Sequence, residues 1–290
     1  MRKNDTGEQL SISRVDENKT SMAVFSPLGG QILELSLNGR QIIGGYAGQD
    51  TMAQIFGYTM APWPNRLADG AYRFRDQFFQ VEKLDEDNNA NHGLVLKQQM
   101  EVISHSADSL TLLYSFGEDK CYPFALDLET KFSLQKDSLL VTSVARNNAG
   151  HSIPFALGFH PYFTLGDKFD ITADFSHRIE TDKRKLPIGE SQIGGIHFDQ
   201  DSQELASLDD CFYGASEVII NTNGFECSIK SLDNFRYFML YRPNTKVFDG
   251  FSAVAIEPMS HQTNVFNADI ASTEIAAGDE KVFSYEIRIR

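Results

Sequence analysis

Short runs in which apolar and polar residues alternate dominate this chain, and such runs predict half-buried β-strands. Leucine occupies positions 33, 35 and 37, and the apolar residues Phe, Tyr, Ile and Ile occupy every second position from 283 to 289. Turn-forming pairs separate neighbouring runs at Asn38-Gly39, Lys136-Asp137 and Asn223-Gly224. Asn-Gly favours the left-handed backbone of tight hairpins. The pattern therefore predicts a series of antiparallel hairpins.

Helical patterns are scarce, and the best candidate is the short stretch SQELASLDD, with Ser202 as its N-cap. Parallel sheets need crossover helices between strands, and this chain lacks their pattern. The least regular part is residues 164–215, within which residues 181–195 (TDKRKLPIGESQIGG) have the composition of an exposed loop. We expect an all-β fold, a large antiparallel β-sandwich, formed as a single domain over residues 1–290.

Composition narrows the class of partner. The chain has 290 residues, with 26 Lys+Arg against 40 Asp+Glu and a net charge of −14, which disfavours nucleic acid and anionic membranes as partners. The first ten residues contain no apolar leader, and no apolar run reaches membrane-spanning length. Three scattered cysteines without CxxC spacing favour a reducing, cytoplasmic location over a disulfide framework or a zinc site.

Two distant strands share an unusual design. In residues 155–160 (FALGFH), bulky residues alternate with Ala156 and Gly158 until His160, which precedes a proline. In residues 253–257 (AVAIE), the alternate positions are alanines until Glu257, again before a proline. Because proline cannot donate to a sheet, both strands are expected to stop there. The small residues suggest the floor of a concave surface with His160 and Glu257 at its edge.

A carboxylate on an apolar strand is costly to bury without a partner. The alternative to a functional pair is that His160 and Glu257 only bond each other or the backbone. A stiff, proline-rich segment (APWPNR) presents Asn65 and Arg66, and Trp63 within it suits either sugar stacking or core packing.

Five motifs give a resemblance to a known family. NRLADGAYRF, NHG, GFHPYF, LDDCF and AIEPM occur in the order and approximate spacing of the aldose 1-epimerases, or galactose mutarotases. The resemblance spans residues 57–267 and implies that family's antiparallel supersandwich. The chain departs from the best-known members at HPYF, at Asp209-Asp210 and after AIEP, which indicates a divergent branch of the family.

The resemblance also implies residue roles. By position, His160 corresponds to the family's general acid and Glu257 to its general base. His92 and Arg66 correspond to residues near the sugar ring oxygen, with Asn65 beside them, and Asp209 to the residue that binds a sugar hydroxyl. Anomers interconvert when a base removes the proton of the anomeric hydroxyl while an acid protonates the ring oxygen. A nearby carboxylate is expected to favour the imidazolium form of His160.

The partner so implied is a small aldohexose, with no metal and no cofactor. Three alternatives stay open: a hexose-6-phosphate 1-epimerase that uses a phosphate pocket made by Lys183, Arg184 and Lys185, a non-catalytic sugar-binding domain, and a metalloenzyme with His92, His160 and Glu257 as ligands.

Overall fold

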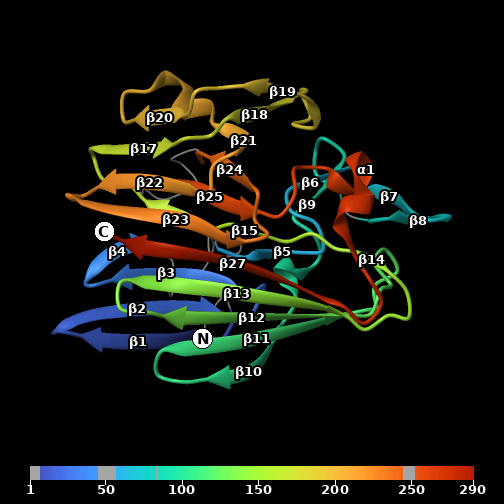
Figure 1. Ribbon diagram of the computed structural model, residues 1–290, viewed down its shortest axis with the longest axis horizontal. Helices are drawn as coiled ribbons and strands as arrows, with labels where there is room; N and C mark the ends of the chain where they lie inside the picture. The colour runs from blue at the N-terminus through green and yellow to red at the C-terminus, as the bar shows by residue number, and fades with distance from the viewer. Residues whose placement is uncertain (1–6, 45–56, 83, 244–251) are drawn as a thin grey trace.

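A computed structural model describes residues 7–44, 57–82, 84–243 and 252–290. Its largest sheet is antiparallel and has nine strands in the order β10-β11-β12-β13-β27-β23-β22-β17-β20 (Figure 1). These strands are β10 (Glu101–His105), β11 (Ser109–Phe116), β12 (Leu126–Leu134), β13 (Ser138–Asn147), β27 (Glu280–Ile289), β23 (Phe225–Asp233), β22 (Glu217–Thr222), β17 (Phe169–Ala173) and β20 (Ile196–Asp199).

A second sheet of eight strands carries the candidate site. Its order is β19-β18-β21-β24-β25-β15-β5, and β16 also pairs with β25. These strands are β19 (Pro187–Gln192), β18 (His177–Thr181), β21 (Asp209–Tyr213), β24 (Tyr237–Tyr241), β25 (Ala253–Met259), β15 (Gly158–Phe159), β5 (Thr59–Met60) and β16 (Tyr162–Thr164).

Smaller elements complete the described part of the chain. A four-stranded sheet consists of β1 (Leu10–Asp16), β2 (Lys19–Ser26), β3 (Gln31–Leu37) and β4 (Arg40–Ile43). Three two-stranded pairs are β6 (Arg66–Ala68) with β9 (Asn89–Asn91), β7 (Ala71–Phe74) with β8 (Gln77–Gln80), and β14 (Ile153–Pro154) with β26 (Glu274–Ile275). The helices are short: η2 (Val95–Lys97), η3 (Gln203–Ser207), α1 (Val265–Ala268) and η5 (Ile270–Thr273). None of the helices in these residues has the length and apolar character needed to cross a bilayer.

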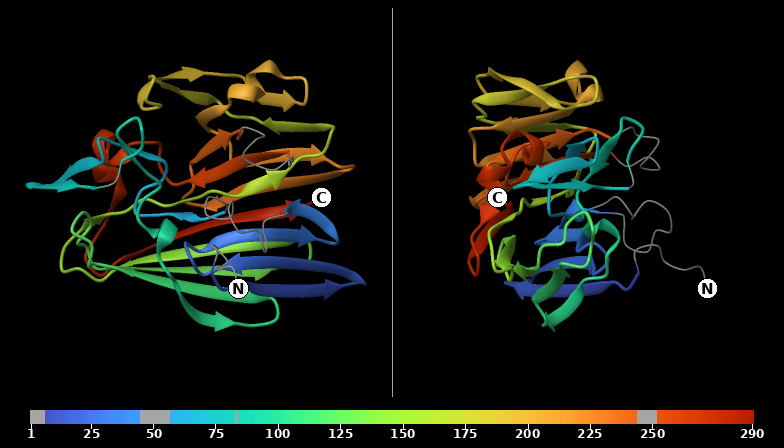
Figure 2. Two further views of the ribbon diagram at one scale, coloured as in Figure 1. Left: turned by 180° about the vertical axis from the view of Figure 1, so that it is seen from behind. Right: turned by 90° about the vertical axis from the view of Figure 1, so that its right-hand side faces the viewer.

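The sheets pack face to face through one continuous apolar core. Seen from behind, the four-stranded sheet lies in front of the lower part of the nine-stranded sheet (Figure 2). The Phe25 and Phe132 rings join these two sheets with centroids 4.6 Å apart, and the Phe159 and Tyr285 rings join the eight-stranded sheet to the nine-stranded one at 5.2 Å. The predicted antiparallel sandwich is confirmed, and it rests on the alternation of buried and outward-facing positions along each strand.

The predicted hairpins are also confirmed. Asn38 and Gly39 have φ of 53° and 76°, and Asn223 and Gly224 have φ of 51° and 78°, the left-handed values that tight two-residue turns require. The first pair joins β3 to β4 and the second joins β22 to β23. The SQELASLDD stretch does form a short helix, but it is the 3₁₀ helix η3. The Ser202 side chain makes no cap bond there and instead donates to Asp199.

Two predictions about irregular positions were wrong. Residues 181–195 are not one exposed loop, because Thr181 ends β18 and residues 187–192 form β19, which pairs with β18 as an antiparallel hairpin around the turn at 182–186. Strand β25 does not stop before Pro258 but continues to Met259. The backbone N–H groups of Ile256 and Ser260 donate to Pro161 and Leu157 on one side of β25. The nitrogen of Pro258 faces that same side, at the point where the neighbouring strand changes from β16 to β15, so its missing donor costs no ladder bond.

Candidate active site

His160 and Glu257 meet at the centre of the eight-stranded sheet. His160 directly follows β15, its backbone N–H donates to Tyr58 O, and Glu257 lies on the neighbouring strand β25. The imidazole Nε2 is 3.1 Å from Glu257 Oε1, although 97 positions separate the two residues in the chain. The exposed fractions are only 5% for His160 and 1% for Glu257. The two groups therefore lie together, but in direct and buried contact with each other rather than at the edge of an open concave surface.

The space next to the small residues beside this pair is occupied by neighbouring side chains. A Cβ atom placed on Gly158 would lie 2.7 Å from Met60 Cε and 2.9 Å from Pro64 Cβ. Ala255 is fully buried, with Tyr162 and Tyr241 as its partners on the adjoining strands. The expected bare floor is therefore wrong. Glycine and alanine occur here because neighbouring side chains pack closely on them.

Burial controls the protonation of the pair. Removal from water raises the pKa of Glu257 well above its usual range, with a further rise from Asp209 and an opposing effect from Arg66. Removal from water also lowers the pKa of His160 to about 3. Both shifts favour uncharged forms, a carboxylic acid and a neutral imidazole. The expectation that Glu257 would favour the imidazolium form finds no support, because removal from water has the largest effect on His160 and lowers its pKa.

Arg66 and Asp209 form the outer part of the site. Arg66 Nη2 donates to Asp209 Oδ2 at 3.1 Å, and the two side chains are 20% and 17% exposed. Asn65 is buried with φ of 54°, and its Oδ1 accepts from the Arg66 backbone N–H at 2.9 Å and from Nη1 at 3.2 Å. Asn65 thus orients the guanidinium, and its role in substrate binding stays a prediction.

His92 completes the cluster from a left-handed position, with φ of 64°. Its ring centroid is 5.3 Å from that of His160, edge to face, and its Nδ1 lies 3.0 Å from Met60 Sδ. Burial and the charges of His160 and Arg66 lower its pKa well below the usual value. A neutral imidazole therefore stands beside the pair.

Aromatic residues that the sequence analysis did not single out surround His160. The Tyr162 ring stacks on it at 4.8 Å and Tyr58 lies at 5.3 Å. Asp209, Tyr241, Ala255 and Tyr162 are direct cross-strand partners over β21, β24, β25 and β16. The available signal was period two, because Tyr162 is two positions after His160 and points to the same face.

Two other candidates lie outside this cluster. Trp63 is 1% exposed and packs against Tyr72 and Phe266, so it belongs to the core and offers no stacking surface to a sugar. Among the residues that the structure describes, no three His, Cys, Asp or Glu side chains gather as a metal-binding group, and His92, His160 and Glu257 are no exception. All three cysteines are buried and free.

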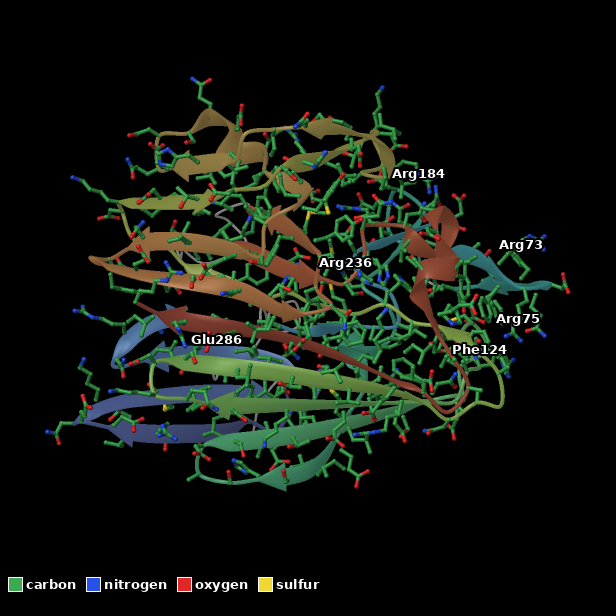
Figure 3. The ribbon with its side chains drawn as sticks, in the orientation of Figure 1. Arg73, Arg75, Phe124, Arg184, Arg236 and Glu286 are labelled. Atoms are coloured by element: carbon green, nitrogen blue, oxygen red, sulfur yellow. The ribbon has the colours of Figure 1, made fainter. Side chains whose placement is uncertain are left out.

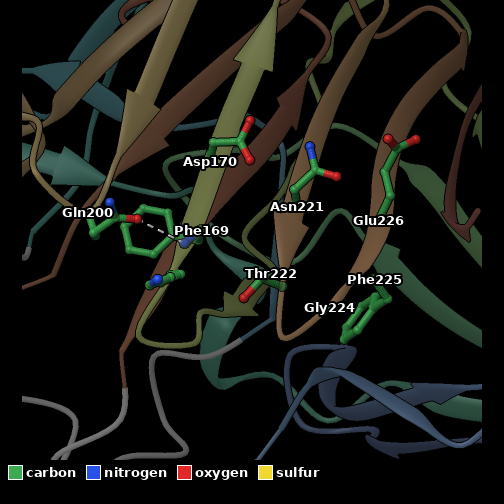
Figure 4. Close-up of a pocket in the computed structure, with 9 residues that line it drawn as sticks. Phe169, Asp170, Gln200, Asn221, Thr222, Gly224, Phe225 and Glu226 are labelled. Atoms are coloured by element: carbon green, nitrogen blue, oxygen red, sulfur yellow. Dashed lines mark hydrogen bonds between the residues drawn. The ribbon is translucent and has the colours of Figure 1, made fainter.

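A surface cavity of about 800 Å³ adjoins the outer part of the site, within the usual size range of small-molecule pockets. Asp209, Tyr241 and Lys185 contribute to its wall, together with η3. A separate cavity of about 450 Å³ lies at β17, β22 and β23, where Asp170, Asn221 and Glu226 form one cross-strand row (Figure 4). It contains neither His160 nor Glu257.

Comparisons with known proteins agree with this fold. The chain is 24% identical over 277 residues to the uncharacterized protein YihR of Escherichia coli (strain K12), covering 91% of this chain and 88% of that protein. It superimposes on the GalM/aldose epimerase homologue of C. elegans with a TM-score of 0.82 and 17% identity, over 98% of this chain and 99% of that one. A galactose mutarotase-like protein from Lactobacillus casei gives a TM-score of 0.76 and 16% identity, over 98% and 100%.

The family model described as aldose 1-epimerase matches residues 12–288, nearly the whole chain. With the antiparallel sandwich and the buried carboxyl–imidazole pair in view, that match identifies the chain as a member of the aldose 1-epimerase family.

Proposed function

We propose that this protein interconverts the α and β anomers of a free aldohexose, with Glu257 as general base and His160 as general acid. The observation that carries the proposal is the 3.1 Å contact between a buried carboxyl group and a buried imidazole on neighbouring strands. The anomeric hydroxyl and the ring oxygen are bonded to the same carbon. One acid and one base held this close together therefore reach both atoms.

A carboxylic acid beside a neutral imidazole carries the same number of protons as a carboxylate beside an imidazolium. The pair can therefore supply one base and one acid, as the reaction needs. Ring opening starts from ionised Glu257 and protonated His160: the anomeric hydroxyl gives its proton to Glu257, and His160 gives its proton to the ring oxygen as the C1–O5 bond breaks. Rotation about C1–C2 and the reverse transfers close the ring as the other anomer. The opened state leaves a carboxylic acid and a neutral imidazole, the forms that burial favours. Burial thus favours the protonation states of Glu257 and His160 that accompany the opened sugar.

Other residues orient the sugar in this proposal. Arg66 lowers the pKa of Glu257, which favours the ionised base, and also lowers the pKa of His160, which favours release of the proton by the acid. Its guanidinium and the neutral His92 lie beside the pair and suit the ring-oxygen side of the sugar. Asp209, fixed by Arg66 at 3.1 Å, accepts a hydrogen bond from a hydroxyl farther along the ring.

The rival substrate class, a hexose 6-phosphate, finds less support. Arg184 donates to Asp69, Asn89 and the backbone of residues 87 and 88, and Lys185 contacts Asp209. Arg184 and Lys185 therefore bind separate partners, and Lys183 is exposed, so these contacts do not form a phosphate pocket. Because Arg66, Arg184 and Lys185 are already paired with carboxylates, a neutral sugar fits this site better than a sugar phosphate.

The test is the anomerisation rate of freshly dissolved α-D-glucose and α-D-galactose, followed by polarimetry beside glucose 6-phosphate. Glu257→Gln and His160→Asn should each slow the catalysed rate by about 10²- to 10⁴-fold, because each removes one proton-transfer group. Glu101→Gln, on the exposed edge strand β10, is the matched control. Wild-type rates in both site variants would refute the residue assignment, and no acceleration by the wild type would favour a sugar-binding domain without catalysis.

A further inference from the structure

The turn between β18 and β19 places Lys185 at the outer part of the site. Asp182 Oδ1 accepts from the backbone N–H groups of Arg184 at 2.8 Å and Leu186 at 2.9 Å, and Lys185 between them is left-handed, with φ of 60°. This backbone geometry directs the adjacent side chains of Arg184 and Lys185 toward different neighbouring residues. Arg184 and Lys185 therefore make separate contacts.

Arg184 fastens the turn to the part of the chain that carries Arg66 and His92. Its Nη2 donates to Asp69 Oδ1 at 2.9 Å and to Asn89 Oδ1 at 3.1 Å, its Nε donates to Asp87 O at 2.9 Å, and Asn89 Nδ2 donates back to Arg184 O at 3.2 Å. In Figure 3, Arg184 lies between the β18–β19 turn and the β6 and β9 segment. The fastening holds the turn over the outer part of the site.

Lys185 shares the Asp209 carboxylate with Arg66. Its Nζ is 3.8 Å from Asp209 Oδ2 and donates to Asp209 O at 3.4 Å, while Arg66 Nη2 donates to the same Oδ2 at 3.1 Å. Within the described residues, no protein group donates to Oδ1. Lys185 also lines the 800 Å³ cavity beside Asp209, and 36% of its side chain is exposed. The ammonium group thus faces the space that a ligand of Asp209 would occupy.

We propose that Lys185 is a positioning residue for the reaction proposed above: together with Arg66 it fixes Asp209 Oδ2 and turns Oδ1 toward a sugar hydroxyl. This inference rests on the proposed function. Lys185 also offsets part of the negative charge of Asp209, which otherwise acts on the carboxyl–imidazole pair. In the described part of the chain, the charged or titratable groups around that pair are Arg66, Asp209, His92, Tyr58, Tyr162, Tyr241 and Cys211.

Two consequences follow for Lys185→Met. The KM for the sugar should rise about threefold to tenfold with a smaller change in kcat, because a half-exposed ion pair is worth little more than this. Removing a cation also makes proton loss from the pair harder, so both limbs of the pH profile of kcat/KM should move to higher pH. If Lys185 had only a structural role, Lys185→Met would leave the pH profile of kcat/KM unchanged and would not raise KM more than it lowers kcat.

The experiment measures kcat, KM and the pH profile for α-D-glucose and α-D-galactose with the full-length protein. Lys185→Arg should restore most of the loss, and Lys183→Met, which removes the same charge two positions away at an exposed site, should behave as wild type. A Lys185→Met variant with the KM and pH profile of Lys183→Met would overturn the inference.

If the wild type accelerates neither sugar, the proposed function fails, and calorimetric binding of the same two sugars then decides this inference. Weaker binding by Lys185→Met than by Lys183→Met supports it. Equal binding, or no binding by the wild type, overturns it.

Discussion

The buried state of Glu257 makes a prediction about stability that needs no substrate. In the unfolded chain a glutamate loses its proton near pH 4.3, whereas burial keeps the folded-state pKa of Glu257 well above its usual value. Above pH 4.3 the unfolded state therefore binds fewer protons than the folded state at this residue. The contribution of Glu257 to stability is fully present below that pH and falls as the pH rises toward the folded-state pKa.

The magnitude follows from one proton. The free energy of unfolding of the wild type, relative to that of Glu257→Gln, should fall by about 1.4 kcal/mol for each pH unit above pH 5, until the raised pKa is reached. His160 is present in both proteins, so its own pH dependence cancels to first order in the difference.

Urea unfolding at pH 5, 6 and 7 measures this difference. The fluorescence of Trp63 reports it, because the sole tryptophan is 1% exposed in the folded protein. Glu101→Gln removes an exposed carboxylate on the edge strand β10 and serves as the control. A wild-type minus Glu257→Gln difference that stays constant from pH 5 to pH 7 would refute the view that burial keeps this carboxyl protonated.

Two further predictions concern the surroundings of the pair. Asp209→Asn removes a negative charge that raises the pKa of Glu257, so both limbs of the kcat/KM profile should move to lower pH while the KM rises; an unmoved profile in pH-dependent polarimetry would contradict the electrostatic link. Gly158→Ala places a methyl group 2.9 Å from Pro64 Cβ, and should lower the free energy of unfolding by about 1–3 kcal/mol, as overpacked cores do. Urea unfolding measures that loss, and wild-type stability would show that the Pro64 segment moves aside at no cost.

Local pattern was sufficient to predict the strands and their hairpins. Alternation along 31–37 and 283–289, and the Asn-Gly turns, depend on residues adjacent in the chain, and the structure follows them. The pattern also predicted the faces of the key strands, because side-chain direction in a strand has a fixed period of two. Val254 and Ile256 join the main core while Glu257 faces the site.

Tertiary structure decided the chemical state of the site and the neighbours that local pattern cannot specify. The proximity of His160 and Glu257 was expected, but their burial beside Tyr58 and Tyr162 was not. This desolvation lowers the pKa of His160 and so favours a neutral imidazole in place of the expected imidazolium. Lys185 reaches Asp209 only because β18 and β19 pair and Arg184 fastens their turn. Solvation and long-range pairing depend on all surrounding atoms at once, so a linear pattern carries no record of them.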